Sequence, residues 1–98
     1  MTNPEAAAAQ ANLKRVRTRH FQSAKDNGIK ITGLTSYDQL TAGIFDEAGI
    51  DFLLVGDSAG NNVYGYDTTL PVTISDLIPL TRAVAGAVNR AFVVADMP

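Results

Sequence analysis

The sequence predicts an α/β fold with a parallel sheet, and two features of the chain support this prediction. Residues 52–55 (FLLV) and 92–95 (FVVA) are unbroken apolar runs, and runs without alternation are typical of strands buried on both faces of a parallel sheet. Segments with helical periodicity precede both runs, which gives the order strand, helix, strand, loop, helix, strand. We therefore expect parallel strands joined by helical crossovers.

The N-terminal part of the sequence is rich in alanine and in positive charge. Residues 1–12 have helix propensity but few bulky side chains, so we expect a disordered arm without a function of its own. Residues 1–30 carry six lysines and arginines against two acids, whereas the remainder carries two against eight. No aromatic interleaving or nucleic-acid motif accompanies these charges. We interpret them as a solvated arm, and we expect no nucleic-acid partner.

A short helix and the first strand are expected next. Thr18 can cap a helix that runs to about Asn27, and Gly28 can supply the left-handed residue that ends it. Residues 29–34 then read as a strand, in which Gly33 indicates a close backbone approach.

The middle of the chain predicts a second helix and a second strand. Either Ser36 or Asp38 can cap this helix, and Gly49 can end it. Its apolar residues repeat at three-to-four spacing and are Leu40, Ile44, Phe45 and Ala48. The strand at 52–55 follows at once. Residues 57–75 are rich in turn-forming residues, so we expect a long lid or binding loop there.

The last helix and strand complete the predicted sheet. Asp76 can cap this helix, which places Pro79 in the first turn, where its missing N–H costs little. The apolar face of this helix is formed by Leu77, Leu80, Thr81, Val84 and Val88. The helix should end near Asn89, and residues 91–95 should form the third strand.

Composition excludes several classes of protein. Of the 98 residues, 46% are hydrophobic and 18% are charged, which is ordinary for a globular domain. The absence of cysteine excludes disulfides and thiolate metal sites and fits a reducing compartment. No apolar run approaches the roughly 20 residues of a membrane span, and the start lacks the apolar core of a secretory signal. We therefore expect a cytoplasmic protein without a membrane partner.

Two aspartates follow the two clearest strands. Asp57 and Asp96 come directly after the ends of their apolar runs, at the edge of a parallel sheet where α/β enzymes place catalytic and metal-binding groups. Two converging carboxylates suit a hard dication such as Mg²⁺. The alternative is that one or both accept backbone N–H bonds and cap loops. Tyr37 and Asp38 follow the first strand and could line the same edge, although Asp38 also fits a helix cap.

A second interpretation of the same segment is a serine hydrolase. Residues 56–60 (GDSAG) match the G-x-S-x-G nucleophile elbow, with Ser58 as the nucleophile. The elbow needs a helix directly after it, and residues 61–66 show no helical periodicity. It also needs a histidine downstream, whereas His20 lies upstream. We therefore interpret His20 as a surface helix residue and prefer the metal hypothesis.

Five segments, in order and at the expected spacing, resemble one enzyme family. They are 34–38 (LTSYD), 45–49 (FDEAG), 54–58 (LVGDS), 65–73 (GYDTTLPVT) and 93–98 (VVADMP). Across residues 14–98 the sequence resembles ketopantoate hydroxymethyltransferase, also called 3-methyl-2-oxobutanoate hydroxymethyltransferase, an enzyme of pantothenate biosynthesis. Five ordered motifs are far more specific than any one of them.

The resemblance implies a (β/α)8 TIM barrel of the phosphoenolpyruvate/pyruvate superfamily type. It implies transfer of a hydroxymethyl group from 5,10-methylenetetrahydrofolate to 3-methyl-2-oxobutanoate, giving 2-dehydropantoate. It further implies that Asp57 and Asp96 bind Mg²⁺, that the 2-oxo acid chelates this ion, and that Ser58 helps to hold the substrate carboxylate. Substrate-binding residues would thus be Asp57, Ser58 and Asp96, and a homo-oligomer is expected.

The resemblance covers only part of such an enzyme. The family's substrate-binding lysine, a further glutamate near the metal and its glutamate general base have no counterpart in this sequence and are expected beyond Pro98. A barrel needs eight strand-helix units and about 250 residues, so we interpret residues 13–98 as the N-terminal part of a single barrel domain. We expect the 98-residue chain alone to be inactive, with an open edge at its third strand. A non-catalytic α/β fragment that binds a partner remains an alternative.

Overall fold

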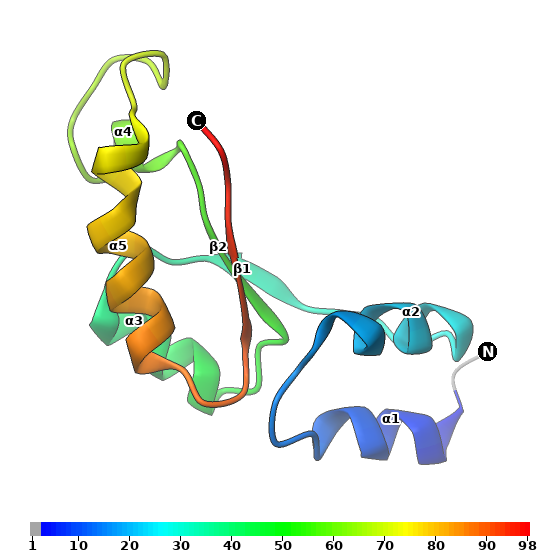
Figure 1. The fold of residues 1–98 in the computed structure, drawn as a ribbon. Helices are drawn as coiled ribbons and strands as arrows, with labels where there is room; N and C mark the ends of the chain where they lie inside the picture. Colours follow the sequence, from blue (N-terminus) through cyan, green and yellow to red (C-terminus); the bar gives the residue numbers. More distant parts are fainter. Residues whose placement is uncertain (1–2) are drawn as a thin grey trace.

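The computed structural model describes residues 3–98 and contains a small parallel sheet with the helices of residues 39–47 and 74–87 on one face (Figure 1). The strands are β1 (Gly33–Thr35), β2 (Phe52–Val55) and β3 (Phe92–Ala95). The helices are α1 (Pro4–Ala11), α2 (Thr18–Asp26), α3 (Gln39–Glu47), α4 (Ala59–Asn62) and α5 (Ile74–Ala87). The α/β class and the parallel sheet are as predicted, whereas the structure contains three strands of the eight that a barrel requires.

The strand order in space is β1-β2-β3, so consecutive strands are neighbours. Both pairs are parallel, and one row of the register aligns Gly33, Phe52 and Phe92. At the other end of the sheet Val55 pairs with Ala95. This register brings the carboxyl ends of β2 and β3 to the same edge, as the sequence predicts.

The hydrophobic core lies between the sheet and the two helices α3 and α5. Leu53 and Val55 are fully buried, and both belong to one cluster with residues of these helices. The other buried members of this cluster are Ala42, Val84, Val88 and Ala91. Burying a side chain of this size stabilises the fold by about 1.5–3 kcal/mol. This core fixes the helix-covered face, so the alternate residues of β2 and β3 lie on the opposite face.

The opposite face is covered only at the start of its strands. The Phe21 ring of α2 makes edge contacts with Phe52 and Phe92, at centroid distances of 6.1 and 5.4 Å. The Phe52 ring occupies the place of a Gly33 side chain, because a Cβ there would lie 2.1 Å from Phe52 Cζ. The group close to Gly33 is thus a side chain and not the backbone that the sequence predicts. Val94, further along β3 on this face, remains exposed.

The N-terminal segment differs from the sequence prediction of a disordered arm. Residues 4–11 form helix α1, whose first N–H groups are capped by the Asn3 side chain, which accepts from Glu5 and Ala6. None of the α1 residues is buried. The helix is attached through its C-terminal end, where the carbonyl of Gln10 accepts a hydrogen bond of 2.8 Å from Arg90. Residues 1 and 2 lie outside the described part of the chain.

Several element boundaries also differ from prediction. Helix α5 begins three residues earlier, because Thr73 is its N-cap and Asp76 closes a capping box as the third helical residue. Pro79 is therefore inside the helix and not in its first turn. The short helix α4 occupies the start of the predicted loop, and β1 begins only at Gly33. Gly28 and Gly49 end their helices with φ values of 69° and 89°, as expected.

Within residues 3–98, no helix combines the length and the apolar character that crossing a membrane requires.

Candidate functional site

Asp57 and Asp96 leave the sheet at the same edge. Val55 pairs with Ala95, and the Asp96 N–H donates to the Val55 carbonyl at 2.9 Å, which extends the pairing by one step. Gly56 therefore lies beside Asp96, and Asp57 is the next residue along. The structure thus brings the two predicted residues to neighbouring positions.

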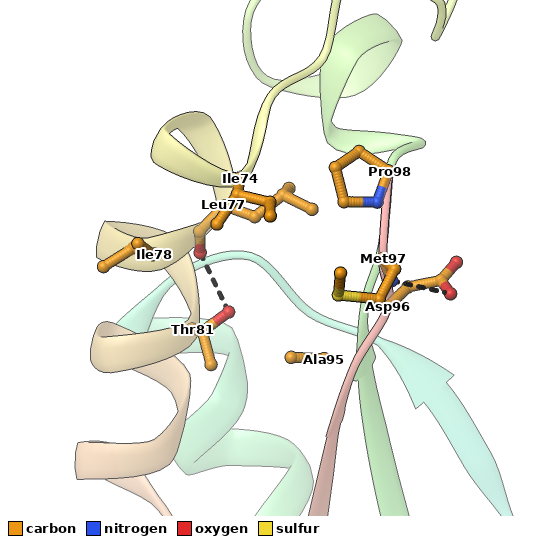
Figure 2. Close-up of a pocket in the computed structure, with 8 residues that line it drawn as sticks. All are labelled: Ile74, Leu77, Ile78, Thr81, Ala95, Asp96, Met97 and Pro98. Carbon is orange, nitrogen blue, oxygen red and sulfur yellow. Dashed lines mark hydrogen bonds between the residues drawn. The ribbon is translucent and has the colours of Figure 1, made fainter.

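The Asp96 carboxylate lies on the face of the sheet opposite the helices. Figure 2 shows it pointing away from α5. A Cβ added at Gly56 would lie 3.6 Å from Asp96 Oδ2, so this carboxylate sits over the Gly56 backbone. Its Oδ1 accepts the Met97 N–H at 3.1 Å, and the side chain is otherwise exposed. Asp96 therefore has free acceptor positions directed at the open face.

The Asp57 carboxylate has no competing partner in the described chain. It is half-buried and accepts no hydrogen bond from residues 3–98. The only ion pair in this range joins Arg90 to Asp51, so neither Asp57 nor Asp96 is neutralised by a basic side chain. Two unpaired carboxylates are a donor set that fits Mg²⁺, which takes one or two carboxylates and fills its other positions with waters and substrate oxygens. No cluster of three or more metal-binding side chains occurs within the same range.

A hydrogen-bonded trio lies next to Asp57. The hydroxyl of Tyr37, just beyond β1, is hydrogen-bonded to Ser58 Oγ, and Asn62 Nδ2 of α4 donates to Tyr37 Oη at 3.3 Å. Burial alone would raise the pKa of Tyr37, but hydrogen bonds with Ser58, Asn62 and Thr35 outweigh it and leave the pKa below its ordinary value. The nearby Asp57 charge acts in the opposite direction. Ser58 therefore faces a polarised tyrosine hydroxyl.

The geometry at Ser58 does not favour a nucleophile elbow. Helix α4 does follow Ser58 directly, so the prediction that no helix would occur there is wrong. However, the Ser58 backbone is ordinary right-handed helical, with φ −57° and ψ −16°, whereas an elbow serine sits on a strained turn. His20 lies on α2, where its Nδ1 accepts the Arg17 N–H at 2.8 Å. No imidazole in residues 3–98 is placed to activate Ser58.

An apolar hollow lies on the other side of β3. It has a volume of about 230 Å³ and lies between α5 and the end of β3 (Figure 2). Its lining residues are Ile74, Leu77, Ile78, Thr81, Ala95, Asp96, Met97 and Pro98. The Asp96 carboxylate points away from this hollow, so the hollow and the carboxylate edge are separate features.

Two roles were predicted for Asp38, a place at the carboxyl edge and a helix cap, and the structure shows the helix cap. Its side chain caps α3 and accepts from the Thr41 N–H and the Thr41 hydroxyl, both at 2.8 Å. These hydrogen bonds lower the pKa of Asp38. Helix capping therefore accounts for this carboxylate.

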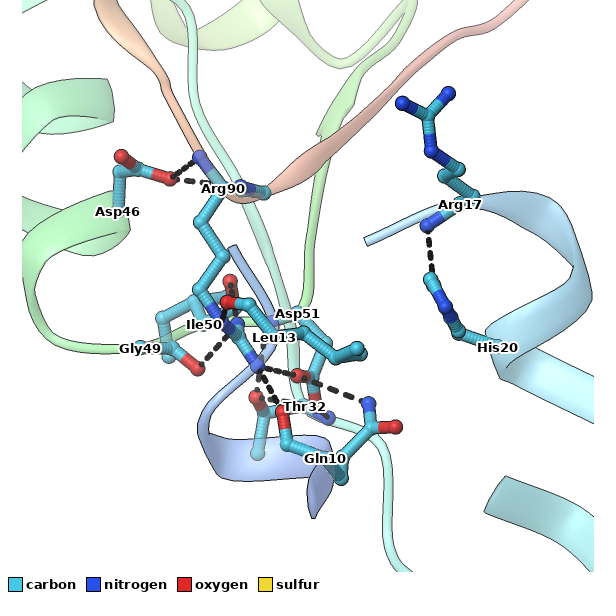
Figure 3. Close-up of polar contacts among 11 residues, drawn as sticks. Gln10, Leu13, Arg17, His20, Thr32, Asp46, Gly49, Ile50, Asp51 and Arg90 are labelled. Carbon is cyan, nitrogen blue, oxygen red and sulfur yellow. Dashed lines mark hydrogen bonds and ion pairs between the residues drawn. The ribbon is translucent and has the colours of Figure 1, made fainter. Parts of the chain in front are cut away.

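Three charged residues near the N-terminal end of the sheet have structural roles that the sequence did not predict. Arg90 donates to the carbonyls of Gln10 and Leu13 and forms an ion pair with the buried Asp51 at 3.1 Å (Figure 3). Asp46 of α3 accepts the N–H groups of three consecutive residues from Asn89 to Ala91. The one available signal was that Asp51 and Arg90 each come shortly before a strand. Such contacts at this end of a parallel sheet serve stability.

The fold and the candidate site together indicate a class of protein. A parallel α/β sheet with two unpaired carboxylates at the carboxyl edge of neighbouring strands is typical of α/β enzymes that act on small molecules. Comparison with known proteins identifies the family. The sequence profile described as ketopantoate hydroxymethyltransferase matches residues 15–98, and the chain belongs to this family.

Curated relatives agree with this assignment. A 3-methyl-2-oxobutanoate hydroxymethyltransferase of Leifsonia xyli is 73% identical over 95 residues, covering 97% of this chain and 34% of the relative. Enzymes of the same name from Paenarthrobacter aurescens and Corynebacterium glutamicum are 56% and 60% identical. They cover 99% and 89% of this chain and 34% and 32% of the relatives. The chain thus spans about a third of the length of these relatives, which are transferases by name.

Proposed function

We propose that this chain forms the metal-binding part of a 3-methyl-2-oxobutanoate hydroxymethyltransferase. The full enzyme would transfer a hydroxymethyl group from 5,10-methylenetetrahydrofolate to 3-methyl-2-oxobutanoate and give 2-dehydropantoate, a step of pantothenate biosynthesis. The observation that carries the proposal is the pair Asp57 and Asp96, which follow neighbouring strands at the carboxyl edge and have no basic partner in the described residues. The family membership supports the same assignment.

The two aspartates would hold Mg²⁺ together with oxygens of the substrate. When bound, Mg²⁺ supplies Lewis-acid chemistry that favours loss of a proton beside the keto group. Asp57 and Asp96 would contribute the negative charge that holds the ion, and Asp96 lies against the Gly56 backbone. The Ser58 hydroxyl, next to Asp57 in sequence, would donate a hydrogen bond to the substrate carboxylate. By the family resemblance, the base that removes the proton lies outside this sequence.

We also propose that residues 13–98 are the first part of a (β/α)8 barrel. The open face of the sheet, with Val94 exposed and Asp96 at its edge, would then face the barrel interior. The 98-residue chain alone should be inactive, because the base and most of the barrel core would be missing. That the full enzyme is a homo-oligomer and that it is cytoplasmic remain predictions.

The metal assignment can be tested in the full-length protein that carries this sequence. We expect Asp57→Asn and Asp96→Asn each to weaken Mg²⁺ binding by at least about 100-fold in calorimetric titration. Turnover should fall in parallel. Glu47→Gln is the matched control, because Glu47 is an exposed acid on α3. Wild-type metal affinity and turnover in either aspartate variant would overturn the proposal.

A further inference from the structure

We propose that Tyr37 is a positioning residue for the 2-oxo acid. In this assignment Tyr37 donates its hydroxyl hydrogen to Ser58 Oγ and so leaves the Ser58 hydrogen free to bind the substrate carboxylate. The inference deepens the function proposed above and rests on it. Tyr37 acts through Ser58 and does not itself touch the substrate.

The fold holds the Tyr37 ring at this place. Ser36, the residue before it, is buried, and its N–H donates to the Leu54 carbonyl at 3.0 Å while its hydroxyl lies 2.9 Å from Thr41 Oγ1. The Tyr37 ring packs against a buried cluster formed by Ala59, Val72 and Leu77. The backbone and the ring are therefore both fixed, which limits where the hydroxyl can point.

The partners of Tyr37 are compatible with a direction of hydrogen bonding that leaves the Ser58 hydrogen free. The side-chain amide of Asn62 donates to Tyr37 Oη, which places Tyr37 as the acceptor of that bond. Tyr37 has one hydrogen of its own, and Ser58 Oγ, which is hydrogen-bonded to Tyr37 Oη, can accept it. A substrate carboxylate can only accept, so a serine that binds it must give up its own hydrogen and accept one from elsewhere. The order Asn62 to Tyr37 to Ser58 to carboxylate satisfies every group.

The surroundings of Tyr37 strengthen this donor role. The Asn62 amide donates to Tyr37 Oη at 3.3 Å, and this bond draws electron density from the phenol and makes the Tyr37 hydrogen a better donor. Successive hydrogen bonds in one direction also polarise one another. Ser58 is thereby prepared to bind an anion.

The test uses a double-mutant cycle in the full-length protein, with Tyr37→Phe, Ser58→Ala and both together. Two readouts are needed: KM and kcat for hydroxymethyl transfer, and the Kd of 3-methyl-2-oxobutanoate with Mg²⁺ in the absence of folate. The control is Tyr66→Phe. Tyr66 packs on the same cluster, but its hydroxyl makes no hydrogen bond within residues 3–98.

We expect Tyr37→Phe to raise KM and Kd for the 2-oxo acid about tenfold, with a much smaller change in kcat. In the Ser58→Ala background the same substitution should change either value by less than about twofold, because the residue through which Tyr37 acts is gone. Thermal unfolding of Tyr37→Phe should match that of Tyr66→Phe. Affinity equal to wild type in Tyr37→Phe, or an undiminished effect in the Ser58→Ala background, would overturn the inference.

The two readouts separate this inference from the proposed function. Binding of the 2-oxo acid that depends on Tyr37, in a protein without hydroxymethyl transfer, would overturn the function and leave the positioning role standing. Hydroxymethyl transfer with the same KM and kcat in Tyr37→Phe as in wild type would overturn the positioning role and leave the proposed function standing. A protein that neither binds the 2-oxo acid nor transfers the group would overturn both.

Discussion

The carboxylate of Asp46, on α3, accepts the backbone N–H of Ala91 at 2.7 Å, at the point where the chain enters β3. The same carboxylate accepts the N–H groups of Asn89 and Arg90 at 2.9 and 3.1 Å. One buried acid on α3 thus holds the connection between α5 and β3. The position of β3, and with it that of Asp96, depends on this contact.

Replacement of Asp46 by alanine should destabilise the protein. The change leaves three N–H groups without their acceptor, at least one of them buried, and such groups cost about 1–3 kcal/mol each. We expect the free energy of unfolding to fall by about 3 kcal/mol in urea denaturation of the full-length protein. Glu47→Ala, at the exposed neighbouring position, should change it by less than about 0.5 kcal/mol. Equal stabilities of the two variants would contradict this role.

The contribution of Asp46 should also depend on pH. Burial would raise its pKa, but the N–H groups of Asn89, Ala91 and Arg90 and the Arg90 charge lower it below the ordinary value. A group whose pKa is lower in the folded state stabilises the fold above its unfolded pKa, about 3.9 for aspartate. This stabilisation is lost as the pH falls through the folded pKa. The difference in unfolding free energy between wild type and Asp46→Asn should therefore be constant from pH 7 to about 5 and should shrink below about pH 4.

Gly60, in α4, should not tolerate a side chain. A Cβ there would lie 2.6 Å from Val72 Cγ2 and 3.3 Å from Tyr66 Cδ2, so the loop that packs on α4 must shift. We expect Gly60→Ala to lower the free energy of unfolding by about 1–3 kcal/mol. The control is Gly43→Ala in α3, where nothing lies within 4 Å of the new Cβ. That change should stabilise the protein by about 0.5–1 kcal/mol, because alanine favours a helix over glycine.

Much of the sheet could be predicted because its signals are local. The apolar runs of β2 and β3 specify strands buried against helices, and the aspartates that follow them are then placed by the topology alone. The five ordered motifs similarly predicted the family that the comparisons identify. Helix α4 was missed because four residues are too few to show a helical period. The start of α5 was misplaced because Asp76 fits an N-cap as well as the third position of a capping box.

Contacts between distant residues could not be predicted in the same way. Arg90 meets Gln10 across 80 positions of sequence, and Asp46 meets Ala91 across 45. Tyr37 meets Ser58 only because the segments after β1 and β2 lie together. Such pairs depend on register and on side-chain direction, which one sequence does not reveal. The Tyr37 and Ser58 pair is the part of the candidate site that only the structure provides.

Arg90 should hold the N-terminal segment on the body of the protein. Its guanidinium donates to the carbonyls of Gln10 and Leu13 at 2.8 and 3.2 Å and pairs with Asp51 at 3.1 Å. The ammonium group of lysine lacks the several N–H donors that the planar guanidinium directs at these acceptors at once. We expect Arg90→Lys to increase amide hydrogen exchange across residues 4–16 at least about tenfold. Arg82→Lys is the control, because Arg82 is exposed on α5. Unchanged exchange in Arg90→Lys would show that other contacts hold the segment.

Ser58 should resist a serine-directed phosphonate probe. A nucleophilic serine needs a base within hydrogen-bond reach, whereas Ser58 Oγ contacts the Tyr37 hydroxyl and His20 is engaged by the Arg17 N–H on α2. The unstrained backbone of Ser58 also lacks the geometry of an elbow. We expect mass spectrometry of the full-length protein to find less than about 5% labelling under conditions that saturate a serine esterase. A chelator should instead abolish hydroxymethyl transfer, because the charge that the reaction needs would come from the ion at Asp57 and Asp96. Stoichiometric labelling of Ser58, with activity that survives the chelator, would favour the hydrolase over the transferase.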